Sequence, residues 1–326
     1  MTRLGEFEFI AQLLAPLSQG APGAFNLTDD AAALTPRHGY DLVLTKDAVI
    51  AGVHFLGSDP PGDIARKALR VNLSDLAAKG AKPVGFLMAL AINEACDDAW
   101  LRAFVGGLAD DVRAFQCPLL GGDTVATPGP VTITITALGE VKTGAMIRRS
   151  GALPGDHLCV TGTIGDAALG LDVINGQHAF LNPSDREFLI DRYRLPQPRV
   201  AFGQAEAGRE TAAIDISDGL CADVGHICAQ SGAAAVIEAS KVPLSAAARA
   251  VVARDPAAIT RILTGGDDYE LAFAVPPANI AATLAHGRRV GVPVTDIGRF
   301  EGGSGVTVLD DKGAAIALSS PGYRHR

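Results

Sequence analysis

The sequence predicts a two-domain α/β (α+β) protein in which each domain contains a mixed sheet. Apolar runs of strand length alternate with longer segments whose apolar residues recur at helical spacing, in both halves of the chain. The 326 residues are enough for two hydrophobic cores of ordinary size. Glycine and proline turns at residues 142–155 separate the halves, so we predict an N-terminal domain over residues 1–145 and a C-terminal domain over residues 146–326.

The first half is expected to alternate helices with strands. Apolar spacing predicts an opening helix over residues 5–18, and a strand over residues 41–45 is expected to end at Lys46 and Asp47. Asp63 is placed to cap a helix that ends near Lys79. The other expected elements are extended chain over 49–55, a strand over 84–92, a helix over 99–115, a strand that leads into a loop at Gly121-Gly122-Asp123, and a strand over 131–141.

The second half repeats the alternation. Pro183, Pro196 and Pro198 indicate irregular structure before a helix over residues 200–207. Gly265-Gly266-Asp267 resembles the glycine-rich segment of the first half and hints at an internal repeat. The other expected elements are strands over 157–161, 212–216, 234–237, 271–275, 294–298 and 306–309, and helices over 167–174, 220–230 and 279–286.

Composition excludes several classes of function. The net charge of -8 argues against a nucleic-acid partner, because affinity for its backbone comes largely from Lys and Arg. The longest apolar run, at residues 84–92, is shorter than the roughly 20 residues of a membrane span, and residues 1–8 carry acids where a signal peptide is apolar. We therefore expect a cytoplasmic protein without a membrane partner. Five cysteines without C-x-x-C spacing predict free buried thiols rather than zinc or disulfides.

The recurring chemical feature is aspartate in turns. The chain has no P-loop, no dinucleotide-binding glycine motif, no protein-kinase signature, no His-Glu-x-x-His and no Gly-x-Ser-x-Gly. Two carboxylates about 4 Å apart repel by about 4 kcal/mol at an effective dielectric of about 20, so several of them together need cations. Oxygen ligands without His or Cys clusters favour Mg²⁺ or Mn²⁺, and magnesium usually shares substrate phosphates. The pattern indicates nucleotide chemistry.

Each of these signals also has a structural interpretation. An aspartate in a glycine-rich turn is often a cap, Lys46 beside Asp47 is compatible with a local ion pair, and His54, Arg148-Arg149 and Tyr323 are compatible with packing or solvation. Within the apolar helix that precedes Gly80, however, a polar stripe of Asn72, Asp75 and Lys79 at spacings of three and four residues indicates a function.

An ordered set of motifs runs from residue 5 to Tyr323. The motifs are Gly5-Glu6-Phe7, Asp29-Asp30-Ala31-Ala32, Thr45-Lys46-Asp47, Gly52-Val53-His54-Phe55, Asn72-Leu73-Ser74-Asp75-Leu76-Ala77-Ala78-Lys79-Gly80-Ala81, Gly121-Gly122-Asp123-Thr124, Arg149-Ser150-Gly151, Asp215-Ile216-Ser217-Asp218-Gly219-Leu220 and Gly265-Gly266-Asp267-Asp268-Tyr269-Glu270-Leu271. Together they resemble the thiamine-monophosphate kinase family. That family is similar in fold to aminoimidazole ribonucleotide synthetase and selenophosphate synthetase, which use ATP without a P-loop.

The resemblance implies an ATP-dependent kinase that converts thiamine monophosphate to thiamine diphosphate by direct transfer of the γ-phosphoryl group. It implies a homodimer formed through the N-terminal sheet, with ATP in a cleft and several Mg²⁺ ions. Asp47, Asp123 and Asp218 are expected to act in the transfer. By position, the implied magnesium ligands are Asp30, Thr45, Asp47, Asp75, Asp123, Asp215 and Asp218; the ATP contacts are Gly122, Asp123, Arg149 and Ser217; the thiamine monophosphate contacts are His54, Asp267 and Tyr323.

Three positions depart from the family pattern. Lys46 stands where threonine is usual, Asp267 where glutamate is usual, and Thr28 where glycine is expected. Two alternatives remain open: another ATP-using member of the superfamily, or a catalytically silent nucleotide-binding protein. A selenophosphate synthetase is expected to carry a reactive cysteine near its N-terminus, and this chain has no cysteine before Cys96.

Overall fold

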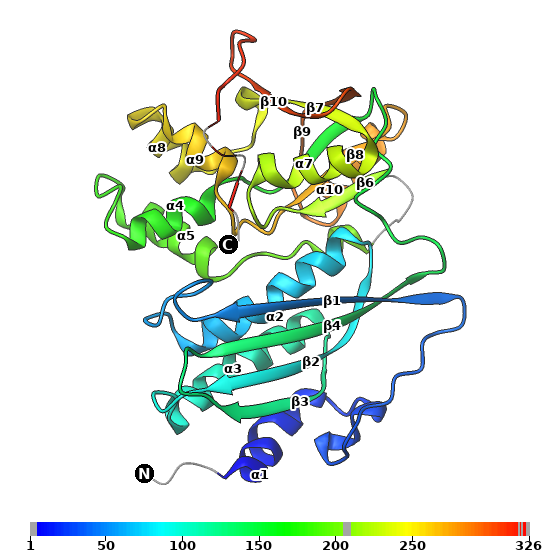
Figure 1. Ribbon diagram of the computed structural model, residues 1–326, viewed down its shortest axis with the longest axis vertical. Coiled ribbons are helices and arrows are strands. Elements are labelled where there is room, and N and C mark those ends of the chain that lie inside the picture. The colour runs from blue at the N-terminus through cyan, green and yellow to red at the C-terminus, as the bar shows by residue number, and fades with distance from the viewer. Residues whose placement is uncertain (1–4, 205–209, 319, 321, 324–326) are drawn as a thin grey trace. The chain divides into compact units, whose positions relative to one another are not determined.

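The computed structural model describes residues 5–204, 210–318, 320, 322 and 323. The chain divides into two compact units, the N-terminal unit of Met1–Leu76 and Ala81–Gly144 and the C-terminal unit of Ala77–Gly80 and Ala145–Arg326. Each unit contains one mixed sheet, with four strands in the first and six in the second (Figure 1), which confirms the predicted fold class. Among the described residues, no helix combines the length and the apolar character that crossing a bilayer requires.

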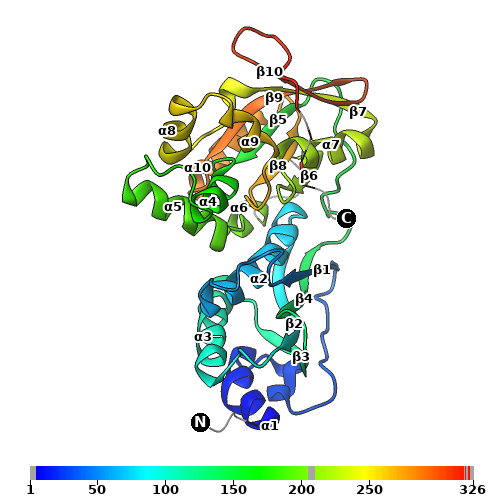
Figure 2. The same ribbon diagram turned by 60° about the vertical axis from the view of Figure 1, so that its left-hand side comes forward.

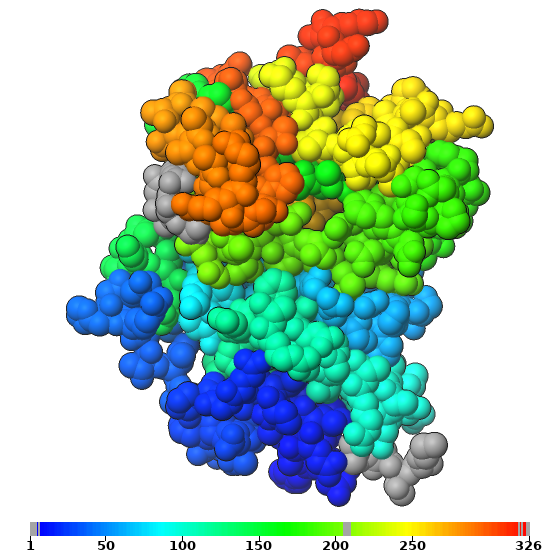
Figure 3. Space-filling model, turned by 180° about the vertical axis from the view of Figure 1, so that it is seen from behind, coloured from blue at the N-terminus to red at the C-terminus, as the bar shows by residue number. Residues whose placement is uncertain are grey.

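The N-terminal unit is a four-stranded sheet with two long helices on one face (Figure 2). The strand order is β1-β4-β2-β3, with β2 and β3 parallel and the other pairs antiparallel. Near the N-terminus, η1 contacts α3, seen as dark blue beside blue-green in Figure 3. The elements are α1 (Glu6–Phe9), η1 (Ile10–Leu14), η2 (Ala15–Ser18), η3 (Pro22–Leu27), β1 (Tyr40–Ile50), α2 (Pro61–Ala78), β2 (Lys82–Ile92), α3 (Asp98–Phe115), β3 (Leu119–Ala126) and β4 (Thr132–Lys142).

This sheet has one buried face and one open face. Ile133 and Ile135 of β4 are each 1% exposed and belong to the core on the helix side. Successive side chains of a strand point to opposite faces, so the residues between them face the other way. On that open face Leu44, Leu87 and Val125 keep 63%, 39% and 46% of their surface exposed. The open face therefore presents large apolar side chains to water.

The C-terminal unit is a six-stranded sheet with the order β10-β7-β9-β5-β8-β6. Among the strands that the structure describes in this unit, β10 and β7 form the one parallel pair. Leu169, Ile262, Ile297 and Phe300 belong to its hydrophobic core. The elements are β5 (His157–Thr161), α4 (Asp166–Ile174), α5 (Pro183–Arg194), α6 (Val200–Gly203), β6 (Ala212–Asp215), α7 (Leu220–Ser231), β7 (Ala233–Glu238), η4 (Ala239–Lys241), α8 (Ala246–Arg254), α9 (Ala258–Thr264), β8 (Leu271–Val275), α10 (Ile280–Arg289), β9 (Val294–Gly302) and β10 (Gly305–Leu309).

Side-chain caps explain where several helices begin. Asp97 accepts a hydrogen bond from the Trp100 N–H at the start of α3, and Ser245 accepts one from the Ala248 N–H at the start of α8. The prediction of irregular structure at Pro183 is wrong, because Pro183 is the first residue of α5, where proline is favoured and Asn182 supplies the cap. Of the predicted helix over 200–207, α6 covers the first part, and residues 205–209 lie outside the described residues.

Two predicted loops are in fact strand. β1 does not end at Lys46 and Asp47 but continues to Ile50, and a turn follows it instead of extended chain. The Gly121-Gly122-Asp123 segment lies inside β3, paired with β2, whereas Gly265-Gly266-Asp267 is a loop before β8. The hint of an internal repeat is therefore wrong for these segments. Both strands are edges of their sheet, where a polar or glycine-rich sequence is tolerated.

The five cysteines are free and buried, as predicted. Burial raises the pKa of the Cys117 thiol to about 12. A thiol in this state is inert, because the reactive form is the thiolate. The cysteines are therefore part of the packing rather than of a reactive site.

Candidate active site

Three predicted metal ligands meet where β1 lies against α2. Thr45 and Asp47 are two residues apart on β1 and therefore share one face of the sheet, and Asp75 belongs to α2. The Thr45 hydroxyl donates a hydrogen bond of 2.5 Å to Asp75 Oδ2. Asp47 and Asp75 are close enough for the charge of one carboxylate to act on the other. The group offers only oxygen atoms.

Side chains hold the edge strand β1 in place beside this group. Asn72, which is 0% exposed, accepts a 3.1 Å hydrogen bond from the Asp47 N–H and donates one of 3.0 Å to the Ala68 carbonyl. The polar stripe predicted on this helix thus includes a residue that aligns Asp47. His54 Nδ1 accepts a 3.1 Å hydrogen bond from the Ile50 N–H, which leaves the proton of the neutral ring on Nε2.

The two carboxylates of this group make the metal-free protein sensitive to pH. Desolvation, followed by the neighbouring Asp75, raises the pKa of Asp47 from 3.8 to about 6. An acid with a raised folded-state pKa binds its proton more tightly in the native state, so stability falls as pH rises from about 3.8 to about 6. Because much of the Asp47 surface is exposed, water screens the effect and keeps it small.

We expect Asp47→Asn to remove this pH-dependent loss of stability. In EDTA, the Tm of the variant minus the Tm of the natural protein should increase between pH 4 and pH 6 and remain constant above pH 6. The measurement is thermal unfolding of both proteins in matched buffers, with Asp41→Asn, on the same strand, as the control. An unchanged Tm difference across that range would show that the pKa of Asp47 is not raised in the folded protein.

Asp123 lies at the opposite edge of the same sheet. The pairing register places it level with Ala89, Thr134 and Ala48, which share its face. Asp47 is therefore three strands away, about 14 Å, and on the other face. Beside Asp123, a Cβ atom on Gly122 would lie 1.9 Å from the Met88 carbonyl oxygen, so only glycine fits there. Within one chain, the structure does not bring Asp123 to the Thr45, Asp47 and Asp75 group.

Asp30 lies on the β3 side of the N-terminal unit. It follows η3, which contacts β3, and its N–H donates a 2.8 Å hydrogen bond to Asp29 Oδ1. Its side chain is exposed. Asp30 and Asp123 are thus the predicted ligands of the β3 side, whereas Thr45, Asp47 and Asp75 are those of the β1 side.

In the C-terminal unit, the turn at residues 217–219 and the loop at residues 265–270 run side by side. They continue the antiparallel pairing of β6 with β8: the Tyr269 N–H donates to the Ile216 carbonyl and the Asp267 N–H to the Ser217 carbonyl, both at 2.8 Å. The contact is close, since a Cβ atom on Gly266 would lie 2.3 Å from the Ser217 carbonyl oxygen. The structure therefore brings together the predicted ligands Asp215 and Asp218, the ATP contact Ser217 and the substrate contact Asp267.

Tyr323 joins the same group through its backbone. Its N–H donates a 2.9 Å hydrogen bond to the Asp218 carbonyl, while its side chain is 54% exposed. Gly322 lies so close to α7 that an added Cβ atom would be 2.6 Å from the Asp218 carbonyl oxygen and 2.5 Å from Ala222 Cβ. The C-terminal end of the described chain is thus attached to the 217–219 turn.

Two buried acids to which the sequence interpretation gave no role hold the 265–270 loop. Asp268 accepts hydrogen bonds from the Gly165 and Ala167 N–H groups at the start of α4, and burial raises its pKa well above the usual value. Glu270 accepts hydrogen bonds from the Thr161 hydroxyl and from Nε and Nη2 of Arg199. Asp267 lies before these anchors at φ 74°, and Tyr269 between them at φ 50°, a conformation that non-glycine residues rarely adopt.

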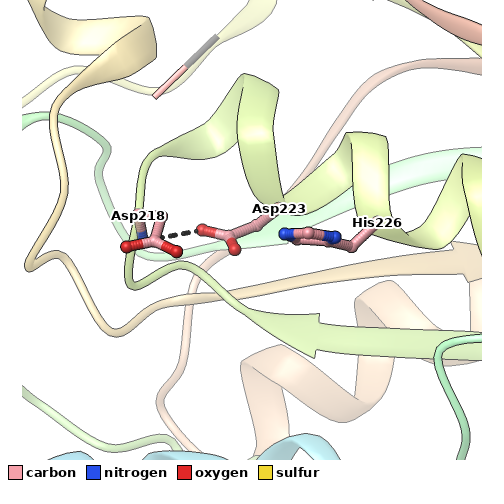
Figure 4. Close-up of side chains that lie close together, drawn as sticks. All are labelled: Asp218, Asp223 and His226. Carbon is pink, nitrogen blue, oxygen red and sulfur yellow. Dashed lines mark hydrogen bonds between the residues drawn. The ribbon is translucent and has the colours of Figure 1, made fainter. Parts of the chain in front are cut away.

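A third missed acid supports the 217–219 turn. Asp223 lies between Asp218 and His226, and oxygen or nitrogen atoms of the three residues all lie within 4.8 Å of one another (Figure 4). Desolvation raises the pKa of Asp223 to about 7. The available signal was its position four residues after Gly219, within one helical turn of the start of α7.

Arg149 is placed apart from this turn. Its carbonyl oxygen accepts a 3.4 Å hydrogen bond from Ser231 Oγ, at the last residue of α7, whereas Ser217 precedes the first residue. The twelve residues of α7 span about 18 Å at about 1.5 Å each. The backbone therefore does not bring the predicted ATP contacts Arg149 and Ser217 together, and the exposed Arg149 side chain lies at the other end of the helix.

Comparison with known proteins places the chain in a family. Residues 28–141 match the family model "AIR synthase related protein, N-terminal domain" and residues 154–311 match the corresponding C-terminal domain. The thiamine-monophosphate kinase of Caulobacter vibrioides is 44% identical over 98% of this chain and 90% of its own. The chain belongs to the thiamine-monophosphate kinase family. The crystal structure of thiamine-monophosphate kinase from Stenotrophomonas maltophilia, 38% identical, superposes with a TM-score of 0.86 over 97% of this chain and 99% of its own.

A second family structure contains ligands. AaThiL complexed with AMPPCP and TMP is 30% identical and superposes with a TM-score of 0.77 over 100% of this chain and 99% of its own. An ATP analogue and thiamine monophosphate thus bind to a protein of this family that has the same fold throughout its length.

The structure accounts for the three departures from the thiamine-monophosphate kinase pattern. Lys46 follows Thr45 and precedes Asp47 on a strand, so it points to the open face, away from both. Thr28 has φ -107°, which any residue adopts, and its hydroxyl donates to the Phe25 carbonyl at 2.7 Å. Asp267 is attached to Ser217 through its backbone. Lys46 and Thr28 leave the predicted metal ligands in place, whereas Asp267 carries the predicted substrate contact on a side chain one methylene shorter than glutamate.

Proposed function

We propose that this protein uses ATP to phosphorylate thiamine monophosphate to thiamine diphosphate, and that it does so in the cytoplasm. The observation that carries the proposal is the full-length relationship to thiamine-monophosphate kinases, one of which has a structure with an ATP analogue and thiamine monophosphate. The acceptor is already an anionic phosphate, so direct transfer needs no covalent enzyme intermediate. The protein's task is to position two anions and to offset their charge.

The donor set of the β1 side fits magnesium. Thr45, Asp47 and Asp75 supply only oxygen atoms, and desolvation followed by the neighbouring Asp75 raises the pKa of Asp47, so a bound cation would favour the charged carboxylate. We assign the ions to Asp30, Thr45, Asp47, Asp75, Asp123, Asp215 and Asp218. When bound, Mg²⁺ neutralises charge on both phosphate groups and holds them for in-line transfer. Asn72 and Asp223 fix the backbone from which these carboxylates project.

The remaining residues bind the two substrates. Gly122, Asp123, Arg149 and Ser217 are assigned to ATP, and the planar guanidinium of Arg149 suits a phosphate oxygen pair. His54, Asp267 and Tyr323 are assigned to thiamine monophosphate. With Nδ1 bonded to the Ile50 N–H, the neutral His54 ring presents Nε2 as a donor. The exposed Tyr323 ring has the flat apolar surface that stacks on an aromatic base.

A homodimer accounts for the distance between Asp47 and Asp123. The two acids lie on opposite edges and opposite faces of one sheet, about 14 Å apart, so one phosphate-bound cation cannot contact both within a chain. Leu44, Leu87 and Val125 on the open face supply an apolar surface for a second copy. In such a dimer, Asp123 lies on the face that meets the second copy, and we propose that it acts with the group on the edge strand β1 of the other protomer, which it would approach around that edge.

Subunit mixing tests the dimer. Protein with Asp47→Asn and protein with Asp123→Asn are each expected to be inactive, and a refolded equimolar mixture is expected to regain about a quarter of the natural activity, because half of the dimers have one intact site. A mixture of Asp47→Asn with Asp75→Asn, both on the β1 side, is the control and should regain none. No recovery in the first mixture would place both acids in one protomer's site.

The activity itself is tested with ATP, Mg²⁺ and thiamine monophosphate, with thiamine diphosphate followed by chromatography. Natural protein should form product and Asp123→Asn should not. ATP consumption with an aminoimidazole ribonucleotide precursor or with selenide instead would favour another member of the superfamily. Binding of ATP without turnover of any of these compounds would favour a silent nucleotide-binding protein.

We expect Gly322→Ala to weaken thiamine monophosphate binding selectively. The new Cβ atom would overlap the Asp218 carbonyl and Ala222, which moves Tyr323 away from the 217–219 turn. The KM for thiamine monophosphate should rise about tenfold, the scale of one lost contact of about 1.4 kcal/mol, and should rise more than the KM for ATP, while the Tm stays unchanged. Gly302→Ala, where an added Cβ meets no atom within 4 Å, is the control. An unchanged KM would separate Tyr323 from the substrate.

A further inference from the structure

One carboxylate oxygen of Asp223 accepts hydrogen bonds from the three consecutive backbone N–H groups of the 217–219 turn. Asp223 Oδ2 accepts hydrogen bonds from the N–H groups of Ser217, Asp218 and Gly219 at 3.0, 3.0 and 3.1 Å. The side chain is 2% exposed and lies beside Asp218 in Figure 4. Gly219, the cap of α7, has no side chain to bond these groups. All three N–H groups of the turn therefore depend on one residue.

Three consecutive N–H groups before a helix normally form an anion site. Backbone concavities of this kind bind phosphate, and the N-terminus of a helix adds a favourable dipole. Here the protein's own carboxylate occupies the concavity. The turn's N–H groups are thus withheld from ATP, and phosphate has to be bound by side chains and cations instead.

The carbonyl groups of the same turn are also engaged. The Ser217 carbonyl accepts from the Asp267 N–H and the Asp218 carbonyl from the Tyr323 N–H. With N–H groups held on one side and carbonyls on the other, the backbone of the turn has one arrangement. That arrangement sets the direction of the Ser217 and Asp218 side chains, and it spaces Asp267 and Tyr323 relative to them.

We propose that Asp223 is a positioning residue for phosphoryl transfer, which aims Ser217 and Asp218 and keeps phosphate out of the backbone concavity of the 217–219 turn. The inference rests on the proposed function, because Ser217 and Asp218 are assigned there to ATP and magnesium. Asp223 itself contacts neither substrate. A residue that only capped α7 would affect stability alone, so the two roles differ in what they do to ligand binding.

The test compares Asp223→Asn, Asp223→Leu and Asp310→Leu. Asparagine keeps an acceptor oxygen for the three N–H groups, whereas leucine has a similar size and no acceptor. Asp310 is the matched control: its Oδ1 accepts from the Lys312 and Ala314 N–H groups, and it follows β10, at the sheet edge opposite β6. For each protein, kcat, both KM values, the Mg²⁺ concentration for half-maximal activity and Tm are measured.

We expect Asp223→Leu to lower kcat/KM for ATP by about a hundredfold, the effect of a misplacement of about 1 Å, and to raise the Mg²⁺ requirement. Inorganic phosphate should inhibit Asp223→Ser, whose shorter side chain vacates the concavity, more strongly than it inhibits the natural protein. Asp223→Asn should keep kcat/KM and the Mg²⁺ requirement close to natural, and Asp310→Leu should change Tm alone. If folded Asp223→Leu has the same kcat/KM as the natural protein, the proposal is overturned. It is also overturned if folded Asp223→Asn loses as much kcat/KM as Asp223→Leu does.

Binding of Mn²⁺ with ATP, followed by electron paramagnetic resonance, separates this inference from the proposed function. If the natural protein forms no thiamine diphosphate, the function fails, while about tenfold weaker Mn²⁺–ATP binding by Asp223→Leu would still support positioning. Equal binding by the two proteins would overturn it. If Asp223→Leu does not fold, Asp223→Ser replaces it, because its shorter side chain cannot reach all three N–H groups, and the same outcomes apply.

Discussion

Replacing Asp47 with asparagine is expected to lower kcat about a thousandfold, the scale on which loss of one electrostatic contact to a transition state acts. Asparagine has nearly the same shape, and Asn72 still accepts the hydrogen bond from the backbone N–H of residue 47. The change therefore removes negative charge beside Thr45 and Asp75 and leaves the strand in place. Rapid-quench measurement of a single turnover with saturating ATP, Mg²⁺ and thiamine monophosphate isolates the transfer step.

The matched control for this variant is Asp41→Asn. Asp41 lies on the same strand and the same face, and its carboxylate accepts a 2.9 Å hydrogen bond from the Gly144 N–H, which asparagine also accepts. Its turnover should equal that of the natural protein. If Asp47→Asn retains more than a tenth of natural kcat, Asp47 does not act in the transfer, and the β1 group is structural.

Asp111→Leu is expected to be the most destabilising single change in the N-terminal unit. Asp111 is 1% exposed and accepts hydrogen bonds from Arg70 at 2.6 and 2.9 Å and from Arg66 at 3.3 Å, which join α2 to α3. Removing one partner leaves a buried cation without its counter-ion, which costs about 3–5 kcal/mol of unfolding free energy. Chemical denaturation, with the single tryptophan, Trp100 on α3, as the fluorescence probe, reports this unit directly.

The neighbouring Asp110→Ala is its control. Asp110 forms an exposed ion pair with Arg113, with 61% and 63% of the two side chains in solvent, so its loss should change the free energy of unfolding by less than about 1 kcal/mol. The double variant Asp111→Leu with Arg70→Leu should recover part of the stability, because no buried charge of that pair remains. Equal effects of Asp110→Ala and Asp111→Leu would show that the buried pair contributes no more than an exposed one.

The local sequence pattern was sufficient to predict the bounds of an element where an uninterrupted apolar run lies between turn residues. The strands at residues 157–161 and 271–275 were predicted to the residue, because each is an apolar run between polar turn residues. α5 was missed because its sequence is mostly polar and begins with proline, a residue that is common both at the start of helices and in turns. β1 and β3 were shortened because aspartate and glycine are poor strand formers, although edge strands accept them.

The arrangement of the site depended on contacts that a local pattern does not contain. The family motifs located Asp47 and Asp123, but only the strand order shows that they lie on opposite edges. The supporting acids Asp268 and Glu270 bind backbone or arginine groups up to 103 residues away in the chain, so neither spacing nor composition distinguishes them from surface acids. Asp223 differs, because the N–H groups that it binds are local and its spacing from Gly219 was an available signal. The motifs at residues 215–219 and 265–270 lie side by side because they adjoin β6 and β8, which are neighbouring antiparallel strands.

The left-handed residues of the 265–270 loop have a consequence for how tightly a ligand can be held. A non-glycine residue in that conformation costs about 1–3 kcal/mol, and the loop contains two, Asp267 and Tyr269. The anchors at Asp268 and Glu270 maintain the conformation in the folded protein, before any ligand arrives. A substrate that meets an ordered loop does not have to immobilise it, so the entropy of association is less unfavourable. Loosening either anchor should therefore appear in calorimetry as a larger entropic penalty for the same contacts.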